Sequence, residues 1–419
     1  MTDLRLEESS VRPDYSSSCL SNVPSTLMSI LGVENGRNKL PEAVFEGVDT
    51  TGVENIVLFI FDGLGLGEWE RQAGQGFFPK IGGRGRVSPL TTVFPSTTST
   101  ALTTITTGLT PQEHSLIEWF LYLKEADGII KTLPFSPMES HGSDLLKDID
   151  PRTLFDGEPI FARLAREGVG TYSYIPSPIA YSSYSRVIHS KSEVHPYFFA
   201  TDLAVMLRKR LEASTSPSLH YVYSSTIDST EHAYGPGSEE SYQEAARVSR
   251  AIDTGLLSKI DGTTASKTLL VATADHGHVF SPMTQTHWLD ACKPLVESFA
   301  RSPSGKTILP WGAPRDVYLR VQEDKLAEVH GYLNDEVSGF ATVAKTADMV
   351  AAGLFGLGSP TPTFLERVGN LMLLPKGKGT VWYHHPGMED LTMIGQHGGI
   401  HRDEMTIPLA VARASALMG

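Results

Sequence analysis

The sequence predicts a three-layer α/β/α sandwich into which a smaller α+β cap domain is inserted. Three continuous apolar runs, at residues 56–61, 220–227 and 269–274, are typical of strands in a parallel sheet that is covered on both faces. Strand-like and helix-like segments alternate from residue 55 to about residue 281, which indicates an α/β layered domain. The chain has 419 residues, enough for one large core and a second, smaller domain.

The first part of the chain contains most of the predicted sandwich. Residues 1–50 are polar and Ser-rich, and we expect them to form an N-terminal extension that packs on the core. The first part of the α/β core is expected over residues 51–281. Within it, residues 160–167 have the apolar spacing of a helix, with Asp156 as the expected cap. A longer helix is expected over residues 238–260, whose first residue, a serine, is a good N-cap.

The last third of the chain has a different character. Residues 282–389 contain loops, a strand expected at 317–321, an amphipathic helix expected at 325–333 and a Pro/Gly-rich segment. We interpret this stretch as the inserted cap domain. The chain then returns to the core over residues 390–419, which include a QHGG loop and an apolar stretch at 406–411.

Composition limits the classes of function. The formal net charge is −13 and the sequence pI is about 5.5, which disfavours a nucleic-acid-binding groove. The two cysteines, Cys19 and Cys292, are far apart, so a thiolate zinc site and a disulfide framework are not expected. The N-terminus lacks the apolar segment of a signal peptide, and no run reaches the length of a membrane span. We therefore expect a cytoplasmic protein; the sequence leaves its oligomeric state open.

An aspartate follows each of the three apolar runs, and histidines accompany these aspartates. Ligands of open α/β sheets bind beyond the carboxyl ends of the strands, so the carboxylates are expected to converge on one rim. Converging Asp and His side chains predict a metal site, and their number suggests two ions. Taken singly, each residue has an ordinary alternative as a turn aspartate, a helix cap, or a core or loop histidine. The residues are Asp62, Asp228, His232, Asp275, His276 and His397.

Residues 94–108 (FPSTTSTALTTITTG) are rich in hydroxyl groups and also contain apolar residues at helical spacing. A hydroxyl-rich turn that enters a helix fits this pattern. A hydroxyl at a helix N-terminus near a cation is well placed to act as a nucleophile, because the helix dipole and the cation both favour its oxyanion. The alternative is a Ser/Thr-rich cap without chemistry.

Together these motifs resemble the alkaline phosphatase superfamily, and within it the type I phosphodiesterase / nucleotide pyrophosphatase group. The resemblance rests on five segments in this order: FDG at 61–63, the hydroxyl-rich segment at 94–108, DSTEHAYGP at 228–236, ADHGH at 274–278 and QHGG at 396–399. It implies an alkaline-phosphatase-like fold and a metal-dependent hydrolase of phosphodiester or pyrophosphate bonds, acting on a small-molecule phosphoester.

The resemblance also implies the ligands of two zinc ions and a nucleophile. One ion would be held by Asp228, His232 and His397, and the other by Asp62, Asp275, His276 and the nucleophile oxygen. In the family a TG pair follows the nucleophile helix, with its Thr nine residues after the nucleophile. Counting back from Thr107 selects Thr98, with Ser96 and Thr97 as alternatives.

The ligand chemistry supports this assignment independently. Mixed imidazole and carboxylate ligands suit zinc, with manganese as the next choice. Thr98 would attack phosphorus and form a phosphothreonine, which water would then hydrolyse. We expect His278 to contact the metal-binding residues without itself binding the metal, and His114 to have a structural role.

The sequence departs from the group at two positions beside the nucleophile. Ser99 replaces an aromatic residue that helps to hold a nucleobase, and Ala101 replaces an Asn expected to bind a phosphoryl oxygen. The oxyanion contact is therefore unassigned, and Arg315, Lys376 and Arg402 are unranked candidates.

The alternative functions are those of a phosphomonoesterase, a phosphonate hydrolase, or a non-catalytic, metal-stabilised binding protein. The absence of a basic residue beside Thr98 favours a diester over a monoester.

Overall fold

The first of two seven-stranded sheets forms the centre of the larger half of the protein. The computed structural model describes residues 6–140, 146–388 and 391–418. The strands of this sheet, in spatial order, are β2 (Arg86–Thr91), β18 (Thr406–Arg413), β9 (Thr268–Thr273), β1 (Asn55–Phe61), β8 (Ser218–Ser224), β6 (Gly170–Pro176) and β7 (Glu193–Tyr197). The neighbouring strands from β9 to β7 pair in parallel, whereas β18 pairs antiparallel with both β9 and β2.

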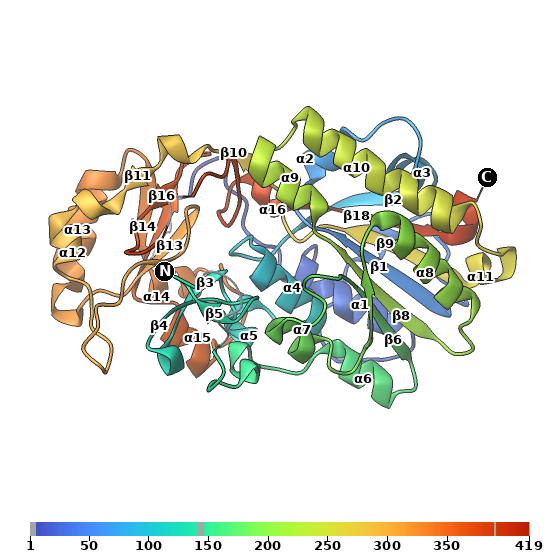
Figure 1. Cartoon of the computed structure of the whole chain (residues 1–419), viewed down its shortest axis with the longest axis horizontal. Coiled ribbons are helices and arrows are strands. Elements are labelled where there is room, and N and C mark those ends of the chain that lie inside the picture. The colour runs from blue at the N-terminus through green and yellow to red at the C-terminus, as the bar shows by residue number, and fades with distance from the viewer. Residues whose placement is uncertain (1–5, 141–145, 389–390, 419) are drawn as a thin grey trace.

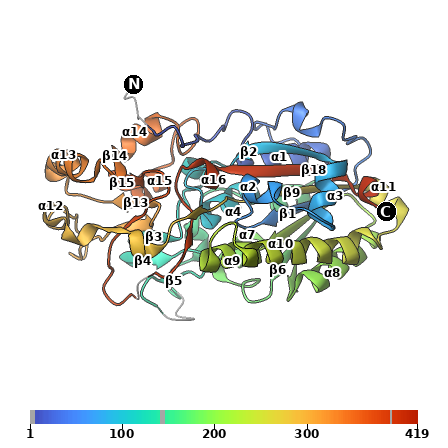
Figure 2. The same ribbon diagram turned by 90° about the horizontal axis from the view of Figure 1, so that it is seen from above.

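Helices cover both faces of this sheet, which confirms the predicted α/β sandwich (Figures 1 and 2). One layer is built around α10, which contacts its three neighbours: it comprises α3 (Phe77–Arg84), α8 (Ala200–Glu212), α9 (Thr226–Tyr234) and α10 (Glu239–Ile252). The other layer is built around α4: it comprises α1 (Val23–Ile30), α4 (Thr98–Thr107) and α6 (Ile160–Arg166). The central strands β1, β8 and β9 are buried along their whole length, as their continuous apolar runs require.

The second sheet lies at the other end of the molecule and is entirely antiparallel (Figure 1). In spatial order its strands are β14 (Ala341–Lys345), β15 (Leu371–Pro375), β13 (Asp316–Leu319), β12 (Trp311–Ala313), β3 (Phe120–Leu123), β4 (Gly128–Lys131) and β5 (Ser136–Pro137). Its helices are α12 (Lys293–Val296), α13 (Leu326–Val337), α14 (Thr346–Ala351) and α15 (Pro362–Arg367). Strands β3 to β5 come from the stretch that the sequence analysis placed within residues 51–281, so the second sheet is not built from residues 282–389 alone.

Shorter elements connect these parts. The helices are α2 (Leu66–Glu70), α5 (Pro111–His114), α7 (Ser183–Ile188), α11 (Gly262–Lys267) and α16 (Arg402–Met405). The two-stranded pairs are β10 (Val279–Phe280) with β17 (Gly395–Gln396) and β11 (His287–Trp288) with β16 (Val381–Trp382). Apolar residues of the N-terminal segment, among them Leu20, Val23 and Leu27, pack into the core of the first sheet. Among the described residues, the structure contains no helix whose length and hydropathy would allow it to span a bilayer.

Two local predictions were wrong. Helix α6 begins at Ile160 after Pro159, and Asp156 does not cap it: its Oδ2 accepts a hydrogen bond of 2.7 Å from Ser115 Oγ. Strand β8 ends at Ser224, and residues 226–227 already belong to α9. Asp228 therefore lies in the first turn of a helix rather than directly after a strand. The helix dipole favours a negative charge in this first turn.

Candidate metal centre

The three predicted aspartates converge at the carboxyl ends of three adjacent strands. Asp62 follows β1, Asp275 lies two residues beyond β9, and Asp228 lies in α9 just after β8; β1 is hydrogen-bonded to both other strands. Gly63 has a φ of 78°, and a Cβ there would lie 2.9 Å from the Asp228 Cα. The residue after Asp62 therefore has to be glycine for the carboxylates to approach each other.

The first cluster surrounds Thr98, the first residue of α4. The Thr98 Oγ1 lies 3.1 Å from the His276 Nε2 and 3.5 Å from the Asp62 Oδ1. The His276 Nε2 in turn lies 3.5 Å from the Asp62 Oδ1 and 3.4 Å from the Asp275 Oδ2. Four ligands at about 2.0–2.1 Å from a tetrahedral zinc ion are about 3.3–3.4 Å from each other. Four of the six distances among the ligand atoms of these residues are thus close to those of a tetrahedral zinc site.

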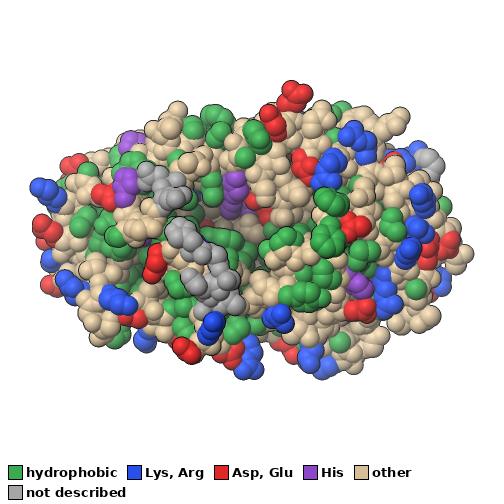
Figure 3. All heavy atoms as spheres, in the orientation of Figure 1, with side chains coloured by type: hydrophobic (Ala, Val, Ile, Leu, Met, Phe, Trp, Pro, Cys, Tyr) green, Lys and Arg blue, Asp and Glu red, His purple; other side chains and the backbone are tan. Residues whose placement is uncertain are grey.

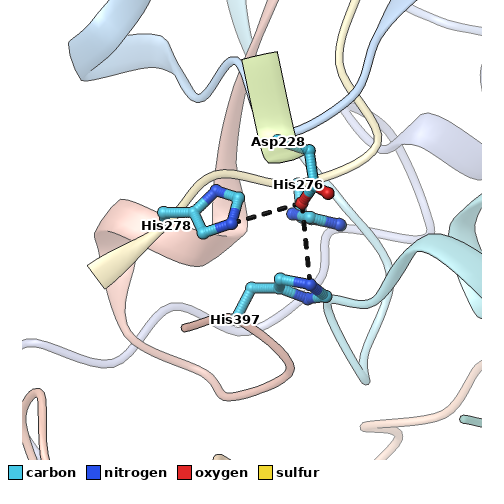
Figure 4. Close-up of side chains that lie close together, drawn as sticks. All are labelled: Asp228, His276, His278 and His397. Atoms are coloured by element: carbon cyan, nitrogen blue, oxygen red, sulfur yellow. Dashed lines mark ion pairs between the residues drawn. The ribbon is translucent and has the colours of Figure 1, made fainter. Parts of the chain in front are cut away.

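The second cluster surrounds the Asp228 Oδ1, and Figure 4 shows His278 and His397 on two sides of it. The oxygen lies 3.3 Å from the His232 Nε2, 3.2 Å from the His278 Nε2 and 3.8 Å from the His397 Nε2. The ligand atoms of Asp228, His276, His278 and His397 all lie within 4.8 Å of one another. The structure thus brings the predicted residues together and adds His278 to them.

The opposite ring nitrogen of each histidine is held by an acceptor. A histidine that binds metal through Nε2 commonly has its Nδ1 fixed in this way, which sets the tautomer and the ring orientation. The backbone carbonyl oxygens of Gly395, Gly277 and Ser96 lie 2.8, 3.2 and 3.1 Å from the Nδ1 atoms of His232, His276 and His397. His278 differs, because its Nδ1 lies 2.9 Å from a carboxylate oxygen of the fully buried Glu231.

Burial and charge indicate that the centre is built for cations. The Asp228 Oδ1 and the Asp275 Oδ2 are buried and have no hydrogen-bond partner among the described residues, which is costly without a counter-ion. Burial, followed by the charges of Asp228 and Asp275, raises the pKa of Asp62 well above its usual range. Burial, and then the neighbouring histidines, lower the pKa of His397 well below its ordinary value. A neutral imidazole is the form that binds metal.

The structure distinguishes between the three candidate nucleophiles. The Ser96 Oγ donates to the Gly399 carbonyl oxygen at 2.8 Å and is fully buried, so it fixes the loop that carries His397. Thr97 is the buried N-cap residue of α4. Thr98 is partly exposed, and its hydroxyl faces Asp62 and His276.

The two positions that depart from the family line neither cavity at Thr98. Ser99 and Ala101 are both completely buried, and Ala101 is part of the core of the first sheet. None of the three basic candidates lines a described cavity at Thr98. The guanidinium of Arg315 is buried and bound to Glu404, Lys376 Nζ donates to the Ser338 carbonyl oxygen, and Arg402 donates to the Glu8 carbonyl oxygen.

Two cavities open at Thr98. The larger has a volume of about 570 Å³ and is lined by Asp62, Thr98 and Asp228 together with largely apolar residues. The smaller, of about 280 Å³, is lined by Thr98 together with His232 and His397. In Figure 3 histidine side chains lie in a hollow near the centre of the molecule, between groups of hydrophobic side chains.

Glu231 and Trp119 were not predicted from the sequence, and His278 was given only a supporting role. Glu231 and His278 lie inside the quoted motifs, the former directly before His232 and the latter two residues after His276, which was the available signal. Trp119 lines both cavities, yet nothing in its local sequence sets it apart from a core tryptophan.

Comparison with known proteins identifies the family of the chain. The sequence profile of the family described as type I phosphodiesterase / nucleotide pyrophosphatase matches residues 56–400. The chain belongs to this family and is therefore a hydrolase of phosphoric ester or anhydride bonds. No curated protein matches the sequence.

Solved structures show the same fold at low sequence identity. Murine ectonucleotide pyrophosphatase / phosphodiesterase 5 has a TM-score of 0.63 and 17% identity, and the match covers 85% of this chain and 87% of that one. The human form has a TM-score of 0.60 and 15% identity, with the same coverage. Phosphonoacetate hydrolase from Sinorhizobium meliloti 1021, solved with phosphonoformate, has a TM-score of 0.58 and 15% identity, covering 86% of this chain and 93% of that chain.

Proposed function

We propose that this protein is a two-zinc phosphodiesterase in which Thr98 is the nucleophile. The observation that carries the proposal is that four of the six distances among Thr98, Asp62, Asp275 and His276 are 3.1–3.5 Å, close to the edges of a zinc tetrahedron. A hydroxyl at this place serves no packing purpose, because it faces a cavity rather than the core.

The roles of the residues follow from their positions. Asp62, Asp275, His276 and Thr98 would hold one ion, and Asp228, His232 and His397 the other. When bound, the ions supply positive charge to the attacking and leaving oxygens of an in-line displacement. The Thr98 oxygen lies at the N-terminus of α4, where the helix dipole favours its anionic form. It forms a bond to phosphorus as the bond to the leaving oxygen breaks, and water then cleaves the phosphothreonine.

We propose a diester rather than a monoester as the preferred substrate. A bare dianion normally requires a further cationic donor. Among the residues that line the two cavities in the described part of the chain, the one cationic side chain is Arg186, which is exposed to solvent and whose Nε donates to the Tyr181 carbonyl oxygen. The wall of the site therefore suits an esterified oxygen better than a second negative charge.

The experiment compares hydrolysis of an aryl phosphodiester and the matching aryl monoester by zinc-loaded protein and its variants. Thr98→Ala should lose at least a thousandfold in kcat, whereas Thr98→Ser should retain part of the activity. Thr97→Ala is the matched control and should keep most of it. A dead Thr97→Ala beside an active Thr98→Ala would show that Thr98 is not the nucleophile, and a monoester preference would contradict the proposed substrate.

A further inference from the structure

The two cavities at the nucleophile share a wall. Both are lined by Thr98, Trp119 and Asp228, and beyond these three residues their linings are different. A phosphorus atom bound at Thr98 would therefore border both cavities. Phosphodiesters have two ester substituents, and the site offers two unequal spaces, of about 570 and 280 Å³.

The smaller cavity is the place for the leaving group. In an in-line displacement the attacking and leaving oxygens are on opposite sides of phosphorus. Thr98 is held by Asp62 and His276 on one side, and the smaller cavity carries His232 and His397 of the second cluster. The departing oxygen would lie beside this second cluster, so the substituent that stays on phosphorus would occupy the larger cavity.

The larger cavity has a predominantly apolar surface. Its walls include Leu102, Leu133, Ile175, Ile179 and Tyr181. Ile179 and Tyr181 are also unusually exposed for apolar residues, at 40% and 55%. Exposed apolar groups that continue an apolar cavity mark a place where an apolar ligand enters.

Several polar groups of this cavity are engaged within the protein. The Tyr184 hydroxyl lies 3.0 Å from the Thr103 Oγ1, and the Ser185 Oγ donates to the Ile179 carbonyl oxygen at 2.8 Å. The Tyr223 hydroxyl donates to Asp62. Recognition of a nucleobase requires free donors and acceptors at defined places, because only an unpaired partner discriminates between ligands. An aliphatic chain binds without hydrogen-bond partners.

We propose that the retained substituent of the substrate is a long alkyl group that lies in the larger cavity, with a smaller leaving group in the cavity beyond Trp119. This inference rests on the proposed phosphodiesterase activity and names its substrate class. The reaction consumes one water: the bond between phosphorus and the leaving oxygen breaks, that oxygen gains a proton, and an alkyl phosphate and an alcohol are released. Each methylene that is buried in the cavity strengthens binding, so the preference should grow with chain length.

The test uses zinc-loaded protein and three diesters that share a 4-nitrophenyl leaving group. Their retained substituents are methyl, octyl and 5′-thymidyl. The octyl ester should have a kcat/KM at least tenfold above that of the methyl ester, and also above that of the thymidyl ester. Calorimetry gives a second measurement: octylphosphonate should bind at least tenfold more tightly than methylphosphonate.

Variants locate the effect. Ile179→Asp places a charge at the exposed edge of the cavity and should lower the octyl-to-methyl ratio several-fold. Leu365→Asp, at a leucine of α15 with 52% exposure that lines neither cavity, should leave that ratio unchanged. Equal rates for methyl and octyl esters, or a thymidyl preference, would overturn the inference while leaving the phosphodiesterase intact. Failure to hydrolyse any of the three esters would instead refute the proposed function.

Discussion

Glu404 joins the second sheet to the loop that carries His397, and its removal tests how that loop is held in place. Its side chain is completely buried in α16. It accepts hydrogen bonds from the Arg315 Nε at 2.9 Å and Nη2 at 2.7 Å, and from the backbone N–H groups of Gly399 at 3.0 Å and His401 at 3.2 Å. Arg315 directly precedes β13, so one carboxylate links a strand of the second sheet to the QHGG loop.

Glu404→Gln should lower the free energy of unfolding by about 3–5 kcal/mol, because removing one partner of a buried ion pair leaves the other charge uncompensated. The loss should also weaken zinc binding, since the loop positions the His397 Nε2. Urea unfolding measures the first effect, and competition with a chromogenic chelator measures the second. The matched control is Asp403→Asn, which removes a neighbouring pair with Lys378 at 2.7 Å whose side chains are 42% and 50% exposed.

The control variant should change stability by no more than about 1 kcal/mol and leave zinc affinity as it is, because exposed pairs contribute little. If Glu404→Gln were no more destabilising than Asp403→Asn, the carboxylate would not be the connection that the structure indicates. If stability fell but zinc affinity did not, the loop would hold His397 in place by other means, such as the hydrogen bond between its Nδ1 and the Ser96 carbonyl oxygen.

Three further predictions concern metal and pH. Zinc at a thousand times its dissociation constant should stabilise the protein by about 4 kcal/mol, so a chelator should lower the calorimetric unfolding temperature; an unchanged temperature would argue against a preformed site. Burial lowers the pKa of His114 to about 3 in the folded protein, below the value of about 6.5 in the unfolded chain. The stability that the neutral imidazole contributes is therefore fully present above about pH 6.5. It falls by about 4 kcal/mol as the pH drops towards 3. His114→Gln should flatten this slope in urea unfolding, and a parallel slope in wild type and variant would exclude His114 as its source. Burial raises the pKa of Glu118 to about 7, above its value in the unfolded chain, so the stability that the protonated carboxyl contributes is lost as the pH rises through 7. Glu118→Gln should therefore be more stable than wild type at pH 8 but not at pH 4.5. A variant less stable than wild type at pH 8 would contradict this.

The sequence predicted the first sheet well because its central strands are covered on both faces. A continuous apolar run such as residues 56–61 is typical of a buried strand, and the aspartate and glycine that follow it mark the strand end. The second sheet was harder to predict, because its strands are short and come from two separate stretches of the chain. Residues 120–137 carry no signal that they pair with a strand at 311–313, and such non-local pairing cannot be inferred from periodicity.

The site was predictable to the extent that its residues follow strands or lie in motifs. The structure brings Asp62, Thr98 and His276 within hydrogen-bonding or ion-pair distance, as the motif order implied. It also places His278 at 3.2 Å from the Asp228 Oδ1, a contact that depends on the turn between β9 and β10 rather than on any spacing rule. The two cavities were not predictable, because they are formed by loops and side chains from separate parts of the chain.

The proposed two-metal centre is tested most directly by the metal content of gently purified protein, measured by elemental analysis alongside the activity on an aryl phosphodiester. We expect about two zinc ions per chain and about one in Asp275→Ala, with activity that a chelator removes and added zinc restores. Protein that contains no zinc or manganese and keeps its full activity in the presence of a chelator would contradict the two-metal site.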